Sequence, residues 1–298
     1  MRKMSEHLIH LPDLSDKEGV IDRIVEGLGR VPIDYVERYE FIRGRNEAGD
    51  RWLAAGVILL LHYQEGTGRE SGFVMQLIKR SSEVPQPGDL SCPGGMLHPS
   101  VDPFLARLMV PGLTPILQGK ALSLAKARGR NTYESLSLFL TNALREAWEE
   151  IRLNPFNVRF LGPLPSRELY VFSRIIFPVV GLVNRPWRFQ PNWEVERIVE
   201  IPLRALFERA NYGTLTVEIE STLPFRHQVE PVRDFPCFFY TPPGGREEVL
   251  WGATMSIVMN FLEIVFGFTL PDKNSNRVVR KSLRPDYATG NHGPSSSP

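Results

Sequence analysis

The nine residues at positions 143–151 constrain the fold of this chain more than any other segment. They read Ala-Leu-Arg-Glu-Ala-Trp-Glu-Glu-Ile, and at about 100° per residue the apolar and acidic side chains separate onto opposite sides of a helix. The side chains predicted to face the core are Leu144, Ala147, Trp148 and Ile151. The carboxylates, which fall within an arc of roughly 100° on the other side, are Glu146, Glu149 and Glu150. The segment therefore predicts a helix that packs on a core and presents its acids together.

Two interpretations of this acidic face stay open on helical geometry alone. A run of charges is most often a solvated surface, and neighbouring like charges cost only a few tenths of a kcal/mol per pair. Clustered carboxylates are also the oxygen ligands that Mg²⁺ prefers, with waters and substrate phosphates completing its octahedron. The choice between surface and metal site depends on the rest of the chain.

The composition is that of an ordinary globular protein: 298 residues, 42% hydrophobic and 23% charged, with a formal net charge of +1. This balance argues against a nucleic-acid partner and against a membrane, so any binding of anions must come from local charge. Cys92 and Cys237 lie far apart and form no C-x-x-C pattern. Reduced, buried cysteines and the lack of an apolar stretch behind residues 1–7 predict a cytoplasmic location.

Strands and helices interleave along the chain without a regular βαβ rhythm, which favours a mixed sheet flanked by helices. Residues 1–48 are expected to be a helical extension, with Ser15 as its cap and Glu18 at the capping-box position. From position 271 the chain turns polar and ends in Gly-Pro-Ser-Ser-Ser-Pro, so residues 271–298 are expected to be disordered. Strands are predicted at 52–62, 72–78, 158–161, 175–183, 195–202, 215–220 and 237–241, and helices at 120–128, 133–153, 203–209 and 253–266.

The acidic helix and the motifs that flank it in the sequence resemble those of the Nudix hydrolases. The signature of that family is G-x5-E-x7-R-E-U-x-E-E-x-G-U, with U a bulky apolar residue. Residues 145–153 match its second half, and Pro93-Gly94-Gly95 resembles its first half. Segments at 79–81, 194–203 and 250–254 are similar to the coenzyme A pyrophosphatase branch, and the resemblance covers roughly residues 50–268. The chain departs from the pattern at four places: Arg152 replaces the late glycine, Asp102 lies one residue past the acid position, Gln86 replaces a histidine, and about 35 extra residues split the signature.

The resemblance implies an α/β/α sandwich with a mixed sheet between helices, formed by residues 49–270, with 103–141 inserted in the Nudix signature. It implies a hydrolase that depends on a divalent metal and cleaves the pyrophosphate bond of a nucleoside diphosphate linked to another moiety, with coenzyme A or a relative favoured. An alternative from another class is a degenerate Nudix domain that binds a nucleotide ligand without cutting it.

The resemblance also carries roles over to individual residues. Glu146, Glu149 and Glu150 are expected to hold Mg²⁺ or Mn²⁺, and Arg145 to orient a carboxylate among them. The catalytic set is expected to be Glu146, Glu149, Arg145 and, as the base, Glu194, with Glu196 as the other candidate. Gly94 and Gly95 are expected to let the backbone approach the helix and the substrate, and Arg80 to bind substrate.

The insertion supports an inference of its own. From Pro103 to Tyr133 there are five Arg or Lys residues and no acid. One hypothesis is a basic lid in which Lys126 and Arg128 contact substrate phosphates. The other is a helical hairpin that packs on the domain, or on a second subunit in a homodimer, with its cations solvated.

Overall fold

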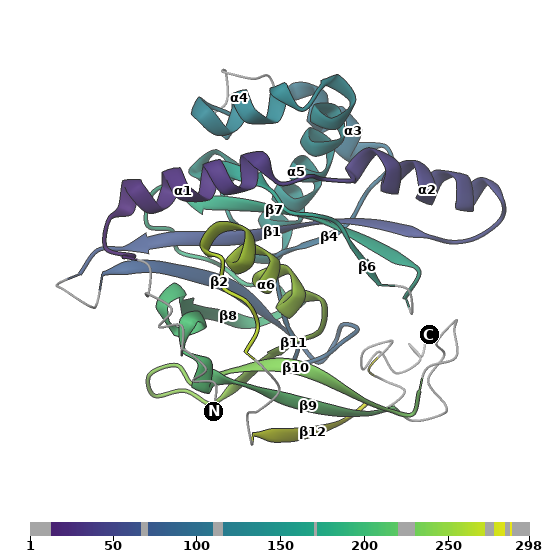
Figure 1. The fold of residues 1–298 in the computed structure, drawn as a ribbon. Helices are drawn as coiled ribbons and strands as arrows, with labels where there is room; N and C mark the ends of the chain where they lie inside the picture. The colour runs from purple at the N-terminus through teal and green to yellow at the C-terminus, as the bar shows by residue number, and fades with distance from the viewer. Residues whose placement is uncertain are drawn as a thin grey trace, which may run out of the picture.

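The computed structural model describes residues 13–66, 71–109, 116–169, 172–219, 230–271, 277–283 and 287. Its centre is a mixed sheet (Figure 1) in which β1 pairs with β7 in parallel and every other pairing is antiparallel. The strands of this large sheet are β1 (Leu53–Gln64), β2 (Gly72–Arg80), β3 (Leu90–Ser91), β4 (Gly94–Met96), β5 (Val158–Pro163), β6 (Arg167–Leu169), β7 (Arg174–Val183) and β8 (Val195–Pro202). The apolar β1 and β7 are buried on both faces, as expected for strands covered from two sides.

Helices cover both faces of the large sheet. They are α1 (Lys17–Arg30), α2 (Tyr35–Glu47), α3 (Val101–Leu108), α4 (Gly119–Ala127), α5 (Arg130–Ile151) and α6 (Gly252–Phe266), with short 3-10 turns η2 (Pro155–Asn157), η4 (Leu203–Phe207) and η5 (Arg209–Asn211). α5 packs on β1 and β4 on one face, and α1 runs along β5 and reaches both α4 and α6. α6 lies on the other side of the sheet (Figure 1).

A second sheet of four strands lies beyond α6, at the bottom of Figure 1. Its strands are β9 (Tyr212–Ile219), β10 (Val232–Tyr240), β11 (Glu248–Trp251) and β12 (Val278–Leu283). β12 pairs with β9 in parallel, so a segment near position 280 joins the edge of a sheet that begins near position 212. A small core of its own, which includes Leu215, Phe239 and Tyr287, supports this second sheet.

The mixed sheet between helices, predicted from the sequence, is confirmed, and so are the predicted strands and helices, with shifted ends and with the helix predicted at 203–209 formed as the short 3-10 helix η4. Three details were wrong. The cap of α1 is Asp16, whose carboxylate accepts from the Gly19 amide, and Ser15 instead bonds to Asp13. The last two strands belong to a separate sheet. The segment from 271 onward is not uniformly disordered, because Val278–Leu283 forms β12; residues 272–276, 284–286 and 288–298 lie outside the described part.

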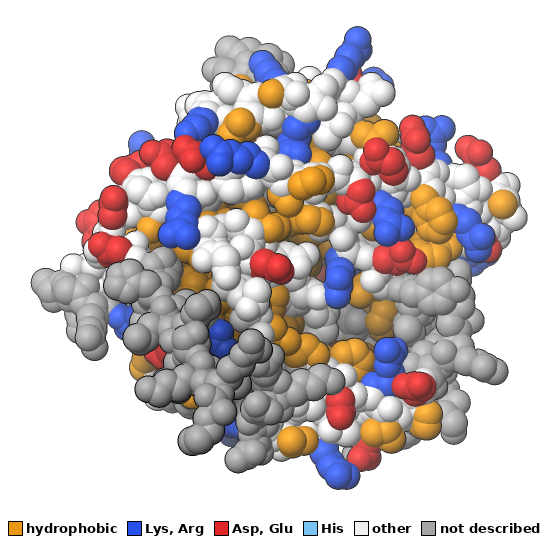
Figure 2. Space-filling model, in the orientation of Figure 1, with side chains coloured by type: hydrophobic (Ala, Val, Ile, Leu, Met, Phe, Trp, Pro, Cys, Tyr) orange, Lys and Arg blue, Asp and Glu red, His pale blue; other side chains and the backbone are white. Residues whose placement is uncertain are grey.

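On the face drawn in Figure 2, the described acidic and basic side chains are interspersed over the helices, in keeping with the formal net charge of +1. Within the described ranges, no helix has both the length and the apolar character needed to cross a membrane.

Candidate metal and substrate site

The acidic helix is positioned by a buried amide and a glycine. Asn142 on α5 is fully buried, accepts a hydrogen bond from the Gly56 amide at 2.6 Å and donates one to the Met96 carbonyl at 3.1 Å. A Cβ atom at Gly56 would lie 2.6 Å from the Asn142 side chain and from the Phe139 carbonyl. Only glycine therefore lets α5 approach β1 this closely, and Asn142 sets the register of the helix against β1 and β4.

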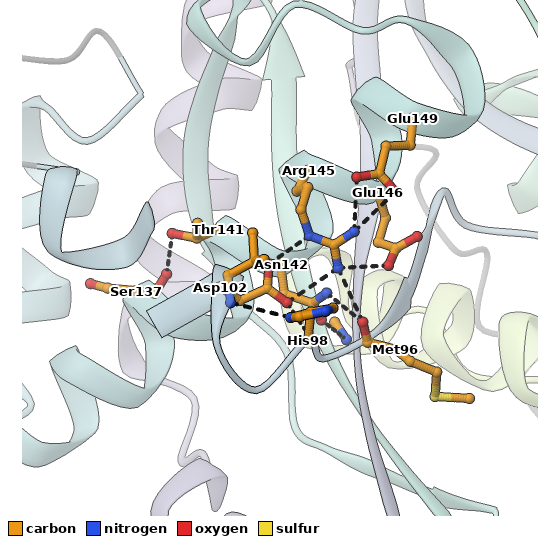
Figure 3. Close-up of polar contacts among 11 residues, drawn as sticks. Met96, His98, Asp102, Ser137, Thr141, Asn142, Arg145, Glu146 and Glu149 are labelled. Atoms are coloured by element: carbon orange, nitrogen blue, oxygen red, sulfur yellow. Dashed lines mark hydrogen bonds and ion pairs between the residues drawn. The ribbon is translucent and has the colours of Figure 1, made fainter. Parts of the chain in front are cut away.

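Arg145 lies at the centre of an acidic cluster (Figure 3). Its guanidinium donates to Asp102 at 2.7 and 3.2 Å, to both oxygens of Glu149 at 3.0 Å, and to Glu146 at 2.8 Å. A further bond reaches the Met96 carbonyl at 3.2 Å. Burial works to lower the pKa of Arg145, but the bonds to Asp102 and Glu149 outweigh it and raise that pKa. One permanent cation thus gathers three carboxylates, and the role of Arg145 in orienting a metal ligand stays a prediction.

Asp102 takes the place of the acid that the signature puts one residue earlier. Its side chain is fully buried, and besides Arg145 it accepts the His98 amide at 2.7 Å. Val101, at the position given by strict spacing, is exposed. Asp102 lies in the first turn of α3, so this short helix turns the displaced acid back toward Arg145. The two halves of the split signature therefore meet in space, although some 40 residues separate Asp102 from Arg145.

Glu150 lies beneath the cluster. It is 4% exposed and accepts a hydrogen bond from the Gly94 amide at 2.9 Å. Burial raises the pKa of this carboxyl to about 8; Gly94 and Arg80 act in the opposite direction, and Glu146 and Glu194 add to the rise. Burial likewise raises the pKa of Glu146. These acids lack sufficient positive charge among the described residues, a condition that a cation would relieve.

Gly95 lies directly against Glu146. A Cβ atom built on Gly95 would be 2.6 Å from the Glu146 carboxyl carbon, so any larger residue would displace that carboxylate. Gly94 has a φ of 143°, and its Cβ would lie 2.4 Å from the Gly56 carbonyl oxygen. The close approach predicted for both glycines therefore has a specific partner at each position.

The core-facing side of the acidic helix is confirmed at Leu144, Ala147 and Ile151, which are buried, but two other positions differ from the prediction. Trp148, predicted to face the core, is 44% exposed, whereas Glu150, predicted to lie on the open side, is buried. The reason is β4, which packs on α5 beside the glutamates and covers the side where Glu150 lies. The prediction from helical spacing alone took no account of β4, so it missed the burial of Glu150.

Arg152 ends α5 in the left-handed conformation, with φ 55° and ψ 31°. Its amide donates to the Trp148 carbonyl at 3.0 Å, and its guanidinium lies 5.5 Å from the Trp148 ring centre. The glycine that the signature has here is thus explained by backbone conformation, and the arginine keeps that conformation with some strain.

Of the two candidate bases, the structure brings Glu194 to the cluster. Residues 190 and 192 donate backbone hydrogen bonds to the last carbonyls of α5, and Glu194 follows them closely enough to act on the charge of Glu150. Glu196 points elsewhere, toward Lys79 and Arg197. Arg80 also acts on Glu150, so this predicted substrate residue lies near the glutamates.

Lys126 and Arg128 are not brought to the cluster. Arg128 donates to the carbonyls of Leu28, Gly29 and Val31 at 2.7–2.9 Å, and so fixes the end of α1. Lys126 is exposed on α4, and neither residue lines the pocket described below. In the described part of the insertion, this geometry favours packing on the domain over a lid; residues 110–115 lie outside that part.

A pocket of about 650 Å³ opens beside the glutamates, between the large sheet, α6 and the second sheet. Gly94, Gly95 and Arg80 line it at the end near Glu150. Its other walls include Phe235, Trp251 and Met255. The volume suits a small organic ligand.

Sequence reasoning missed Asn142 and three arginines of this pocket, Arg167, Arg174 and Arg233. A buried asparagine in the middle of a helix was the available signal for the first. The arginines come from three separate strands, and only the folded chain brings them together.

The comparisons with known proteins agree with the signature. The chain is 34% identical over 120 residues to a Nudix hydrolase NudL of Pectobacterium atrosepticum, which covers 40% of this chain and 55% of that protein. It is 32% identical over 115 residues to NudL of Salmonella paratyphi B, and this match covers 36% of this chain and 58% of that protein. The chain thus spans a little over half the length of these relatives. The resemblance to Nudix hydrolases is confirmed.

No family model matches the chain. Among solved structures, it is similar to RenU, a Nudix hydrolase from M. smegmatis, with 14% identity, 52% of this chain and 76% of that chain covered, and a TM-score of 0.28. It is also similar to the Nudix domain of Shewanella oneidensis NrtR, solved with ADP ribose. The identity is 14%, the match covers 54% of this chain and 79% of that chain, and the TM-score is 0.33.

Proposed function

We propose that this chain is a divalent-metal-dependent hydrolase that cleaves a pyrophosphate bond in a nucleoside diphosphate linked to another moiety, with coenzyme A or a relative as the favoured substrate. The observation that carries the proposal is the Arg145 cluster beside Glu150, at the end of a pocket of ligand size. The named relatives support the same reaction class. The free, buried cysteines suit the cytoplasmic location that is part of the proposal.

The donor set fits Mg²⁺ or Mn²⁺. Glu146 uses one oxygen toward Arg145, and Glu150 uses one toward Gly94, so each keeps an oxygen without a partner among the described residues. In the described ranges no three acidic, histidine or cysteine side chains already surround one point. One or two carboxylates with waters and substrate phosphates are the usual protein share of a Mg²⁺ shell. Glu149 is half-exposed and can turn from Arg145 to add a ligand.

Each residue then has a distinct task. When bound, the metal neutralises the diphosphate and lowers the pKa of a water that attacks phosphorus. Glu146 and Glu150 would hold the metal, and Arg145 with Asp102 would keep the glutamates in place. Glu194 accepts the proton of the attacking water. Arg80 binds a phosphate oxygen at the pocket end of the cluster.

The test is hydrolysis of a substrate panel with Mg²⁺ or Mn²⁺: coenzyme A, ADP-ribose, nucleotide sugars and dinucleoside polyphosphates. We expect turnover that stops in chelator and falls at least about 100-fold in Glu150→Gln. Glu134→Gln is the matched control, since Glu134 lies on the same helix but pairs with Arg130 at the surface. Tight binding of a panel member with no turnover of any would instead support the binding module, and turnover that persists in chelator would exclude metal dependence.

A further inference from the structure

The pocket beside the glutamates contains more positive charge than cleavage of a diphosphate uses. Four arginines line it: Arg80, Arg167, Arg174 and Arg233. Within the described ranges none of the four is in an ion pair. The two acids of the lining are already engaged, Asp89 with Lys281 and Tyr287 and Glu168 with Arg38. Arg80 acts on Glu150, but Arg167, Arg174 and Arg233 have no ion-pair partner among the described residues, which indicates a site built for an anion.

Arg174 is the most constrained of these arginines. Its Nε is shielded from solvent and has no hydrogen-bond partner among the described residues. Burial and the nearby charge of Arg80 lower its pKa to about 10. A buried donor without a partner costs free energy in the folded chain, and an anionic ligand in the pocket would supply the missing acceptor.

Strand register places this positive charge away from the glutamates. Across the large sheet, Met96 of β4 pairs with Ala55, Ala55 with Ile176, and Ile176 with Arg167 of β6. The row crosses three strand spacings, about 14 Å from the Gly94–Met96 end to Arg167. Arg174 precedes Ile176 by two residues on the same face of β7. Arg80, which acts on both Glu150 and Arg174, lies between the two ends.

Arg233 lines the same pocket from the second sheet. It lies on β10, with its guanidinium 5.6 Å from the Phe235 ring centre. Phe235 and Trp251, also in the lining, pack against each other with ring centres 5.5 Å apart. The pocket thus combines a backbone wall at Gly94 and Gly95, which contact Glu150 and Glu146, with aromatic side chains and guanidinium groups.

We propose that Arg167, Arg174 and Arg233 form a subsite for a phosphate monoester carried by the substrate at a distance from the scissile pyrophosphate. Guanidinium groups from three strands suit a dianion with several acceptor oxygens. The preferred substrates are then nucleoside diphosphate derivatives that bear an extra phosphate on the part of the molecule that does not react. The inference rests on the proposed function and narrows it.

The test compares substrates that differ only in this phosphate. One pair is coenzyme A and dephospho-coenzyme A, and a second is NADPH and NADH. We expect kcat/KM to favour the phosphorylated member by about tenfold or more, mainly through KM. In Arg174→Met the ratio should fall toward 1 while the value for the unphosphorylated member is kept. Arg174→Lys, which keeps the charge, should retain part of the preference. Arg43→Met, at an exposed position on α2, is the control.

The outcomes separate the two proposals. Turnover with equal efficiency within both pairs, or a preference unchanged in Arg174→Met and Arg233→Met, overturns the subsite and leaves the hydrolase intact. Absence of any turnover overturns the hydrolase, and calorimetric titration with the same pairs then decides whether the phosphate is bound. Thermal melts identify a variant that fails to fold, in which case Arg233→Met, on the other sheet, replaces Arg174→Met.

Discussion

The Asp102–Arg145 pair is a buried ion pair whose members come from different helices. Removing one partner of such a pair leaves the other charged and incompletely bonded, which costs about 3 kcal/mol or more. We expect Asp102→Ala to lower the free energy of unfolding by roughly that amount, measured by denaturant titration. Asp50→Ala, which breaks the exposed pair with Arg45, should cost less than about 1 kcal/mol. Equal losses in the two variants would mean that Asp102 is not the anchor of Arg145.

Arg152 gives a second prediction at this scale, because its backbone is left-handed. Glycine adopts that conformation without the clash that any side chain brings. We expect Arg152→Gly to be more stable than Arg152→Ala by about 1 kcal/mol, since both variants lose the contact with Trp148 and only one relieves the backbone. Melting temperatures of the two variants measure the difference, and a more stable alanine variant would contradict it.

At the scale of elements, β4 and α5 form one unit whose spacing depends on glycine. A methyl group at position 95 would meet the movable end of Glu146 and not the backbone. We expect Gly95→Ala to melt near the wild-type temperature but to lose at least about tenfold in kcat, because Glu146 is displaced. Gly44→Ala, with no atom within 4 Å of the added methyl group, is the matched control. Full activity in Gly95→Ala would remove Glu146 from the proposed machinery.

The limits of sequence reasoning lie at the same scale. Periodicity located α5 and the strands of the large sheet, because those elements bury a repeating apolar face. It placed Leu144, Ala147 and Ile151 in the core correctly but misplaced Trp148 and Glu150, since a three-residue strand such as β4 has no periodicity of its own. The motif placed Gly94, Gly95 and Arg145 at the site. Arg174 and Arg233 could not be found, because strand pairing alone brings them together.

At the scale of the whole molecule, the second sheet and the segment near position 280 complete the pocket. Asp89, in the loop that follows Arg80, accepts hydrogen bonds from Trp251 at 3.1 Å and Tyr287 at 2.6 Å, and pairs with Lys281. The Gln86 amide donates to the Tyr287 carbonyl at 2.7 Å. Tyr287 thus holds the loop that leads into the Pro-Gly-Gly turn.

We expect Tyr287→Ala to raise KM several-fold with little change in kcat, because the loop and one pocket wall loosen while the glutamates stay in place. Hydrogen exchange should quicken in β9 and β12 and stay slow in β1 and β7. Phe156→Ala, which truncates a ring that is 61% exposed, serves as the control. A fall in kcat with unchanged KM would contradict this role.

The hydrogen bond between Asp89 and Tyr287 also sets the order in which parts of the protein fold during synthesis. It closes a loop of 198 residues, so it forms after the local pairings of the large sheet. At synthesis rates of about 5–20 residues per second, Asp89 waits on the order of ten seconds or more for its partner. A nascent chain can therefore assemble its glutamate helix well before it has a closed binding pocket. A protease that attacks locally opened segments should cleave first near β12 and Tyr287, the segment that closes the pocket.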